Sequence, residues 1–382
     1  MNDITIDKTG WKKWRFDEFA QNISERVEPS QTDMDVYVGL EHIDPDTLHL
    51  SRYGHPSDVE GTKLRFYKGD IIFGRRRAYQ RKTALATTNG ICSAHAMVLR
   101  AKEDVVDPSF FPFLFHSKQF IDMAITISVG GLSPTINWKD ISKQEFLLPP
   151  KSEQKRLAEL LWAADEMIEK EKQSFKLIEN LYLSTISSIF KNQKKYCDLG
   201  ALCSIKSGYA FPIKYQGNKD MPIPFLKVSD MNNLNNKYEI QVSENYINES
   251  ILKSIKGQVF PVGSLVFAKI GATIHTDKKR LLSIESVVDN NIMVLIPIKE
   301  LLDSYFLFYF FNTFKLADII NTGAVPTISA ETVRNIQIPE LDFEEQKNIV
   351  KKIDSIVLTI KQQDQLIGQS QQVKLALVNK IF

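Results

Sequence analysis

Two stretches of the chain carry a regular apolar pattern that predicts long α-helices. Residues 151–190 contain no proline or glycine, and residues 343–382 contain only Gly368. In each stretch the apolar positions are spaced alternately by four and three residues, as in the heptad seam of a coiled coil. The main predicted seam positions are Leu157, Leu161, Ile168, Glu171, Phe175, Ile178, Ile349, Ile353, Ile356, Ile360, Gln363 and Ile367.

A seam of this length needs a partner, and each helix offers one to the other. At about 1.5 Å per residue, each helix would be about 60 Å long. We expect antiparallel pairing in which Glu171 meets Gln363, because a single polar pair in an apolar seam can fix the register. The alternative is that each of these side chains points to solvent where the stripe drifts, and the pattern does not favour either.

The chain also repeats itself at about half its length. The motif GLSPTI at 131–136 recurs as GAVPTI at 323–328, and EQK at 153–155 recurs at 345–347, both with an offset of 192. Looser matches link 37–40 to 225–228, 68–73 to 262–267, and 97–99 to 293–295. Their common order predicts two copies of a globular unit, each followed by a long helix.

Short alternating runs in each globular unit predict an α+β fold. We expect strands at 35–40, 70–73, 94–99, 224–228, 264–267 and 291–296. Aromatic-rich helices are expected at 109–121 and 304–320, with their rings in the core. The predicted organisation is a first domain at 1–148, a spacer helix at 149–195, a second domain at 196–340 and a second spacer helix at 341–382.

Composition changes this picture little. Hydrophobic residues make up 43% of the 382 residues and charged residues 25%, as in ordinary globular proteins. No run approaches the length of a membrane-spanning helix, and the N-terminus lacks the apolar core of a secretory signal. We interpret Cys92, Cys197 and Cys203 as free, buried thiols in a reducing cytoplasm.

The motifs of several enzyme classes are missing from the sequence. There is no GxxxxGK[ST] phosphate loop, no GxGxxG after a strand, no methyltransferase tetrapeptide and no HExxH or paired CxxC. His42, His49 and His55 lie close together in sequence but lack the spacing of metal ligands, so we interpret them as solvent-exposed or structural. We therefore expect a binding protein with no catalytic residue and no metal of its own.

The distribution of charge is more informative than its sum of +2. A basic run follows the predicted strand at 70–73, and further cations follow the equivalent strand of the second unit. Loops on a strand scaffold often carry recognition residues, and arginine contacts both phosphate and guanine. The alternative is an ordinary solvated turn, but recurrence favours DNA binding. The candidates are Arg75, Arg76, Arg77, Tyr79, Arg81, Lys82, Lys269, Lys278, Lys279 and Arg280.

Several motifs together resemble the specificity subunit of type I DNA restriction–modification enzymes. They are FDEF at 16–19, DLGAL at 198–202, KGDI at 68–71, the PTI motifs, and the proline-ended strands that lead into Glu153-Gln154 and Glu345-Gln346. The resemblance covers essentially the whole chain. The second helix departs from the pattern, with PELD at 339–342 where the first has Pro149-Pro150.

The resemblance implies that each globular domain is a target-recognition domain for one half of a bipartite double-stranded DNA sequence, with the antiparallel coiled coil setting the spacing. Two methyltransferase subunits would carry S-adenosylmethionine and flip the adenine, and restriction subunits would use ATP and Mg²⁺. This chain would be a non-catalytic cytoplasmic subunit without a cofactor, and no membrane is implied.

The resemblance does not supply the base-reading residues, because these domains vary with their target. The basic loops therefore remain the candidates. We interpret Gly131, Pro134, Gly323 and Pro326 as turn-forming residues. An assembly scaffold that does not read DNA is the main alternative function, and a stand-alone enzyme is a third.

Overall fold

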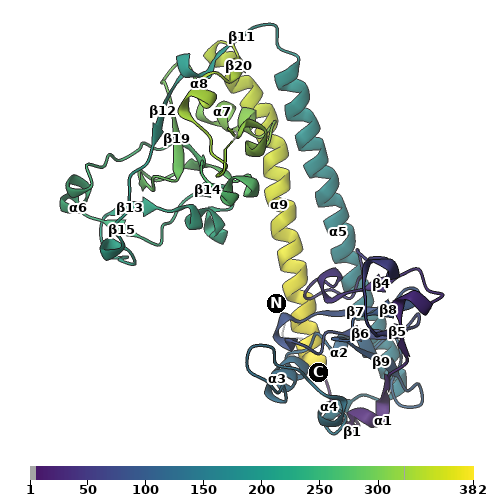
Figure 1. Cartoon of the computed structure of the whole chain (residues 1–382). Coiled ribbons are helices and arrows are strands. Elements are labelled where there is room, and N and C mark those ends of the chain that lie inside the picture. Colours follow the sequence, from purple (N-terminus) through teal and green to yellow (C-terminus); the bar gives the residue numbers. More distant parts are fainter. Residues whose placement is uncertain (1–5, 322) are drawn as a thin grey trace. The chain divides into compact units, whose positions relative to one another are not determined.

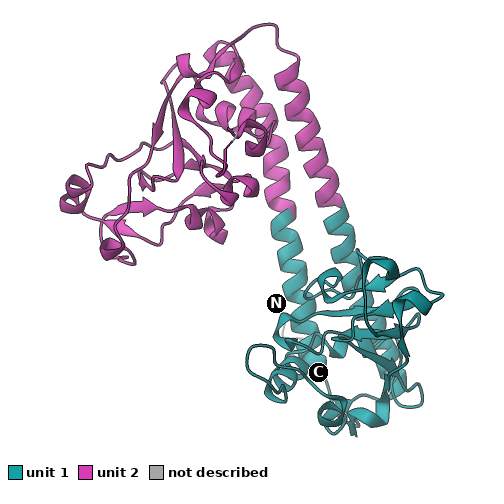
Figure 2. Cartoon of the chain, in the orientation of Figure 1, with its two compact units in different colours: residues 1–173, 364–382 teal, residues 174–363 magenta. Residues whose placement is uncertain are grey.

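A computed structural model describes residues 6–321 and 323–382 of the chain (Figure 1). The chain divides into two compact units (Figure 2). Unit 1 consists of residues 1–173 and 364–382, and unit 2 consists of residues 174–363. Each unit therefore combines the whole of one predicted domain with parts of both long helices. The bounds of the four segments drawn from the sequence stay a prediction.

The described residues of unit 1 form three small sheets. A four-stranded antiparallel sheet has the order β2-β9-β6-β7, a four-stranded mixed sheet has the order β3-β5-β8-β4, and β1 pairs with β10. The strands are β1 Lys12–Arg15, β2 Ala20–Ile23, β3 Arg26–Val27, β4 Tyr37–Val38, β5 Lys63–Phe66, β6 Ile71–Phe73, β7 Thr83–Leu85, β8 Gly90–Cys92, β9 Met97–Ala101 and β10 Glu145–Leu148. The helices are α1 Phe16–Phe19, α2 Phe111–Leu114, α3 Lys118–Thr126, α4 Trp138–Ile141 and α5 Lys151–Lys191, which continues into unit 2.

Unit 2 has the corresponding sheets. Their orders are β12-β19-β16-β17-β14, β15-β13-β18 and β11-β20. The strands are β11 Tyr196–Asp198, β12 Cys203–Ser207, β13 Ile223–Leu226, β14 Glu239–Ile240, β15 Tyr246–Ile247, β16 Leu265–Ala268, β17 Lys279–Leu282, β18 Val287–Val288, β19 Ile292–Pro297 and β20 Gln337–Pro339. The helices are α6 Glu249–Ser254, α7 Ser304–Phe311, α8 Ala330–Arg334 and α9 Phe343–Ile381, which continues into unit 1.

The pairing of strands confirms the internal repeat. In unit 1, β6 pairs antiparallel with both β7 and β9, and in unit 2 β16 pairs in the same way with β17 and β19. The parallel pair of β4 with β8 has its counterpart in β13 with β18. Each of the six predicted strand segments overlaps an observed strand, so the α+β fold class is confirmed.

The two aromatic helices are shorter than predicted. Instead of one helix over 109–121, α2 ends at Leu114 and a new helix starts after Ser117, whose hydroxyl accepts the N–H of Phe120 at 3.1 Å. Such capping serine residues favour a helix start over a continuous helix. The prediction of a helix over 304–320 was also wrong at its end, because α7 stops at Phe311. The rings lie in the cores, as expected, except that of Tyr305, which is 41% exposed.

The two long helices are antiparallel, as predicted. Within unit 1, Asp165 of α5 pairs with Lys374 of α9, and Ser370 donates to Glu171 at 3.1 Å. Residue numbers rise along one helix as they fall along the other. Within unit 2, Ile186 and Phe190 of α5 share a core with Val350 and Ile353 of α9.

None of the twelve predicted seam residues is exposed. Glu171 is bonded to a residue one heptad further along α9 than Gln363. The pairing of Glu171 with Gln363 therefore stays a prediction.

Candidate nucleic-acid interface

The basic loop after β6 is held by the first PTI motif. The N–H of Ile136 donates to the carbonyl of Arg75 at 3.0 Å, and the N–H of Arg77 donates to the carbonyl of Pro134 at 2.8 Å. These two bonds tie the start of the loop to a segment some sixty residues later. The proline motif thus gives the loop a defined backbone.

The same arrangement recurs after β16. The N–H of Ile328 donates to the carbonyl of Lys269 at 2.9 Å, and the N–H of Gly271 donates to the carbonyl of Pro326 at 2.8 Å. We call these two arrangements the loop clamps. Their duplication explains why the PTI motif is repeated, and the backbone role of the prolines supports our interpretation of them as structural.

Arg77 adopts a backbone conformation that favours glycine. Its φ is 56°, whereas the equivalent residue of unit 2 is Gly271, with a φ of 76°. The left-handed region is open to glycine but unfavourable for a residue with a side chain. Unit 1 therefore keeps an arginine at a position where its backbone is strained, which is often a sign of function.

The side chains of the first loop fall into two groups. Arg76 and Arg77 both donate to the hydroxyl of Ser133, through Nη2 at 3.1 Å and Nε at 3.2 Å. Tyr79 is 52% exposed. Arg81 and Lys82 face other parts of unit 1. Arg81 pairs with Asp46 and donates to the carbonyl of His116, and Lys82 donates to the carbonyl of Leu40.

The candidates of unit 2 are more strongly engaged. Lys269 donates to the hydroxyl of Ser207 at 2.8 Å, Lys278 donates to Asn232, and Arg280 donates to the carbonyl of Asn236 at 2.8 Å. Burial lowers the pKa of both Lys269 and Arg280.

Lys279 lies in the interior, where only 3% of it is exposed. It donates to the carbonyl of Phe314 at 2.7 Å and pairs with Asp277 at 2.9 Å. Burial lowers its pKa, and Asp277 partly offsets this effect. We therefore no longer propose Lys279 as a DNA contact.

Two cations beside the first loop were missed from the sequence. Arg26 and Lys63 lie on β3 and β5, which pair so that Val27 stands opposite Lys63. Together with Arg75 they line one groove. Isolated in sequence, they carry no signal, and strand pairing alone brings them together.

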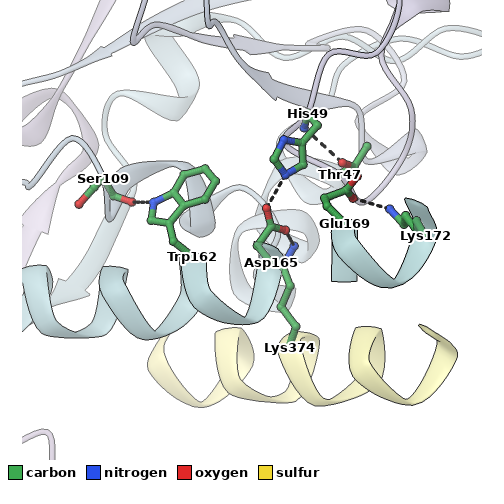
Figure 3. Close-up of polar contacts among 8 residues, drawn as sticks. All are labelled: Thr47, His49, Ser109, Trp162, Asp165, Glu169, Lys172 and Lys374. Atoms are coloured by element: carbon green, nitrogen blue, oxygen red, sulfur yellow. Dashed lines mark hydrogen bonds and ion pairs between the residues drawn. The ribbon is translucent and has the colours of Figure 1, made fainter. Parts of the chain in front are cut away.

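A polar network joins unit 1 to its helices (Figure 3). The buried carboxylate of Asp165 on α5 accepts from His49 Nε2 at 2.6 Å and from Lys374 on α9. Burial alone would raise the pKa of Asp165, but His49 and Lys374 lower it to about 2. The hydrogen bond to Asp165 raises the pKa of His49. His49 therefore has a structural partner, in agreement with our interpretation.

The repeated glutamine of the EQ motifs also has a structural role. Gln154 is buried, accepts from the N–H of Asp107 at 2.7 Å, and donates to two carbonyls of unit 1. Gln346 is buried, accepts from the N–H of Asp303 at 2.9 Å, and likewise donates to two carbonyls. Each glutamine fixes the first turn of a long helix to the loop before the aromatic helix.

Among residues 6–321 and 323–382, no group of His, Cys, Asp and Glu side chains is arranged to hold a metal. Cys92 and Cys203 are buried free thiols and Cys197 is a half-buried one. In the same described part of the chain, no helix is both long and apolar enough to cross a bilayer.

The fold resembles solved structures of one kind of protein. A chain from a structure concerned with complex assembly and conformational transition of the type I restriction–modification system is 18% identical, with a TM-score of 0.63 over 98% of this chain and 97% of that one. The specificity subunit from M. genitalium is 14% identical, with a TM-score of 0.56 over 100% and 97%. The chain thus shares the fold of the M. genitalium subunit.

The sequence leads to the same class. The family described as type I restriction modification DNA specificity domain matches residues 57–180 and 192–369, and the chain belongs to this family. The EcoDI specificity subunit of Escherichia coli is 29% identical over 189 residues, which cover 48% of this chain and 42% of the relative. The MjaIX specificity subunit of Methanocaldococcus jannaschii is 22% identical over 276 residues, covering 67% and 62%. The matches thus span less than two thirds of these two relatives.

Proposed function

We propose that this chain is the sequence-specific DNA-recognition subunit of a type I restriction–modification enzyme. Each unit reads one half of a bipartite double-stranded target, and the helix pair sets the distance between the half-sites. The observation that carries this proposal is the duplicated loop clamp, which presents a cationic loop at the same place in both units. Membership of the specificity-domain family supports it.

The chemistry belongs to partner subunits in this proposal. Two methyltransferase subunits bind S-adenosylmethionine and modify adenine, and restriction subunits use ATP and Mg²⁺ for cleavage. This chain contributes no catalytic residue and no cofactor site, and it acts in the cytoplasm. The relatives are described as specificity subunits of restriction enzymes, which supports this division of labour.

Within the recognition sites we propose Arg75, Arg76, Arg77 and Tyr79 as the main contacts of unit 1. Arginine donates to phosphate or, through two N–H groups, to guanine, and an exposed tyrosine can contact a sugar. In unit 2 we propose Lys269, Lys278 and Arg280, whose side chains must exchange their present protein partners for DNA. Arg81 and Lys82 then have a supporting role, since both are bonded within unit 1.

Methylome sequencing of the host with and without this chain tests the proposal. We expect one split, adenine-methylated motif to disappear when the gene is deleted and to return with the intact chain. An unchanged methylome, with partner assembly intact, would contradict DNA reading and support the scaffold function. Methylation of DNA by the purified chain alone would contradict the non-catalytic role.

A further inference from the structure

A groove beside the first loop clamp is lined by charge of one sign. It has a volume of about 310 Å³ and lies between the turn after β2, the start of β5 and Arg75. Its charged lining residues are Arg26, Lys63 and Arg75, and the described lining includes no aspartate or glutamate. An acidic ligand would therefore meet three cations and no opposing carboxylate in the wall.

Lys63 is fixed in the wall by neutral groups. Only 9% of the residue is exposed, and its ammonium donates to the carbonyls of Glu60 and Gly61, the second at 2.7 Å. These bonds hold the ammonium in place without neutralising its charge. A cation held in a narrow, partly buried site attracts anions more strongly than one on a mobile surface chain.

Arg75 has a donor that the chain does not use. Its Nε is buried and has no hydrogen-bond partner among the described residues, while its backbone carbonyl is held by Ile136. A buried N–H without an acceptor is costly, and a charged donor is best satisfied by an anionic oxygen. The clamp thus fixes the backbone of Arg75, while its buried Nε has no acceptor among the described residues.

His95 lies close enough to the groove for its pKa to respond to the charges of the nearby cations. Burial lowers the pKa of His95, and the charges of Arg76, Arg75 and Lys63 lower it further. Arg76 also approaches His95, with 3.4 Å between Nη1 and Nε2. The positive potential therefore extends from the groove to the arginines of the loop.

We propose that this groove binds phosphate groups of the DNA backbone, beside the DNA contacts proposed for Arg76 and Arg77. The inference rests on the proposed function. Asn22, Ser24 and Thr62 add neutral polar groups to the lining, and Arg, Lys, Ser, Thr and Asn are the side chains that contact phosphate oxygens in DNA complexes. Such contacts set the orientation of the half-site and do not read its bases.

Arg26→Gln tests the groove in the full chain assembled with its methyltransferase subunits. Arg26 is exposed, so the variant should fold. For a duplex carrying the methylated motif, we expect about a fivefold loss of affinity and a salt slope smaller by about one, because one phosphate contact is lost. The preference for the motif over a scrambled duplex should not change. Lys12→Gln, which removes an exposed cation outside the groove, is the control.

Neutral methylphosphonates placed one at a time in the duplex identify the phosphate. At the contacted position, the replacement and Arg26→Gln should not be additive, since both remove the same interaction. An unchanged salt slope for Arg26→Gln would overturn phosphate binding in the groove. Additive effects of the variant and the methylphosphonate at every position would do the same. Either result would leave the proposed function intact. Binding of inorganic phosphate with no such coupling would also overturn it. If deleting the chain changes no methylated motif, the proposed function itself fails.

Discussion

The two units build the same loop clamp but use it differently. In unit 1 the clamped residue Arg75 keeps a buried donor for which the described residues offer no partner, and in unit 2 the equivalent Lys269 donates to Ser207. Arg77 of unit 1 is strained where unit 2 has Gly271. The backbone has been kept while the side chains have diverged, which fits the proposal that the two units read different half-sites.

The long helices likewise make some contacts that are common to both units and others that occur in one unit alone. Gln154 and Gln346 make equivalent bonds in the two units. The charged network of His49, Asp165 and Lys374 belongs to unit 1. In unit 2, Tyr182 occupies the position equivalent to Lys374 and accepts from Asn312 at 3.1 Å.

The largest expected effect concerns the buried glutamine contacts that the two units share. Gln154→Ala and Gln346→Ala should each lower the free energy of unfolding of their unit by about 3 kcal/mol, because several buried backbone groups lose partners. Hydrogen exchange resolved by unit, with urea unfolding, measures this. The exposed Gln372→Ala is the control. If the losses of unfolding free energy differed several-fold between the two variants, Gln154 and Gln346 would not have equivalent roles.

The next effect concerns the charged network of unit 1, compared with the hydrogen bond at the equivalent position of unit 2. Lys374→Met keeps the side-chain length but leaves the buried Asp165 with only His49 of its two cationic partners. We expect a loss of about 2 kcal/mol, less than for a fully orphaned buried charge. Tyr182→Phe in unit 2 removes one hydrogen bond and should cost about 1 kcal/mol. Thermal unfolding measures both losses of free energy. Equal losses for the two variants would show that the charged network of unit 1 is no more stabilising than the single hydrogen bond of unit 2.

DNA affinity distinguishes the two loops. Replacing Arg76 and Arg77 together by Ala should weaken target binding about tenfold and reduce the salt slope by one to two, at about one unit per phosphate contact. Lys269→Ala should have a smaller effect, since the donor is already satisfied by Ser207. Fluorescence anisotropy at several salt concentrations is the measurement. An unchanged slope in the double variant would exclude the first loop as a phosphate contact.

The smallest effect is a pH dependence in unit 1. Because the pKa of His49 is raised on folding, its stabilisation is complete below the unfolded value of about 6.5 and is lost as pH rises through the folded pKa. His49→Gln should therefore cost about 0.5 kcal/mol more at pH 5 than at pH 8, a small difference because the ring is partly exposed. Asp165, Glu169 and Lys374 face this group, and the low pKa of Asp165, about 2, keeps its carboxylate charged over that range. An equal cost of His49→Gln at pH 5 and pH 8 would contradict this role of the protonated ring.

The sequence predicted the helices and the repeat well, but only part of the candidate site. The heptad spacing correctly indicated α5 and α9, and the PTI and EQ motifs proved to be repeated structural elements. It placed Lys279 among the DNA contacts although the side chain is buried. It missed Arg26 and Lys63, which stand alone in sequence.

The amino-acid sequence by itself determined the helix pair and the twofold use of one α+β unit. These features depend on periodic spacing and on repeated motifs, both of which are local properties of the chain. Only the tertiary structure decided which cations face outward and which are buried. That depends on strand pairing and on which carbonyl or carboxylate comes within reach, and both arise from contacts between residues far apart in sequence.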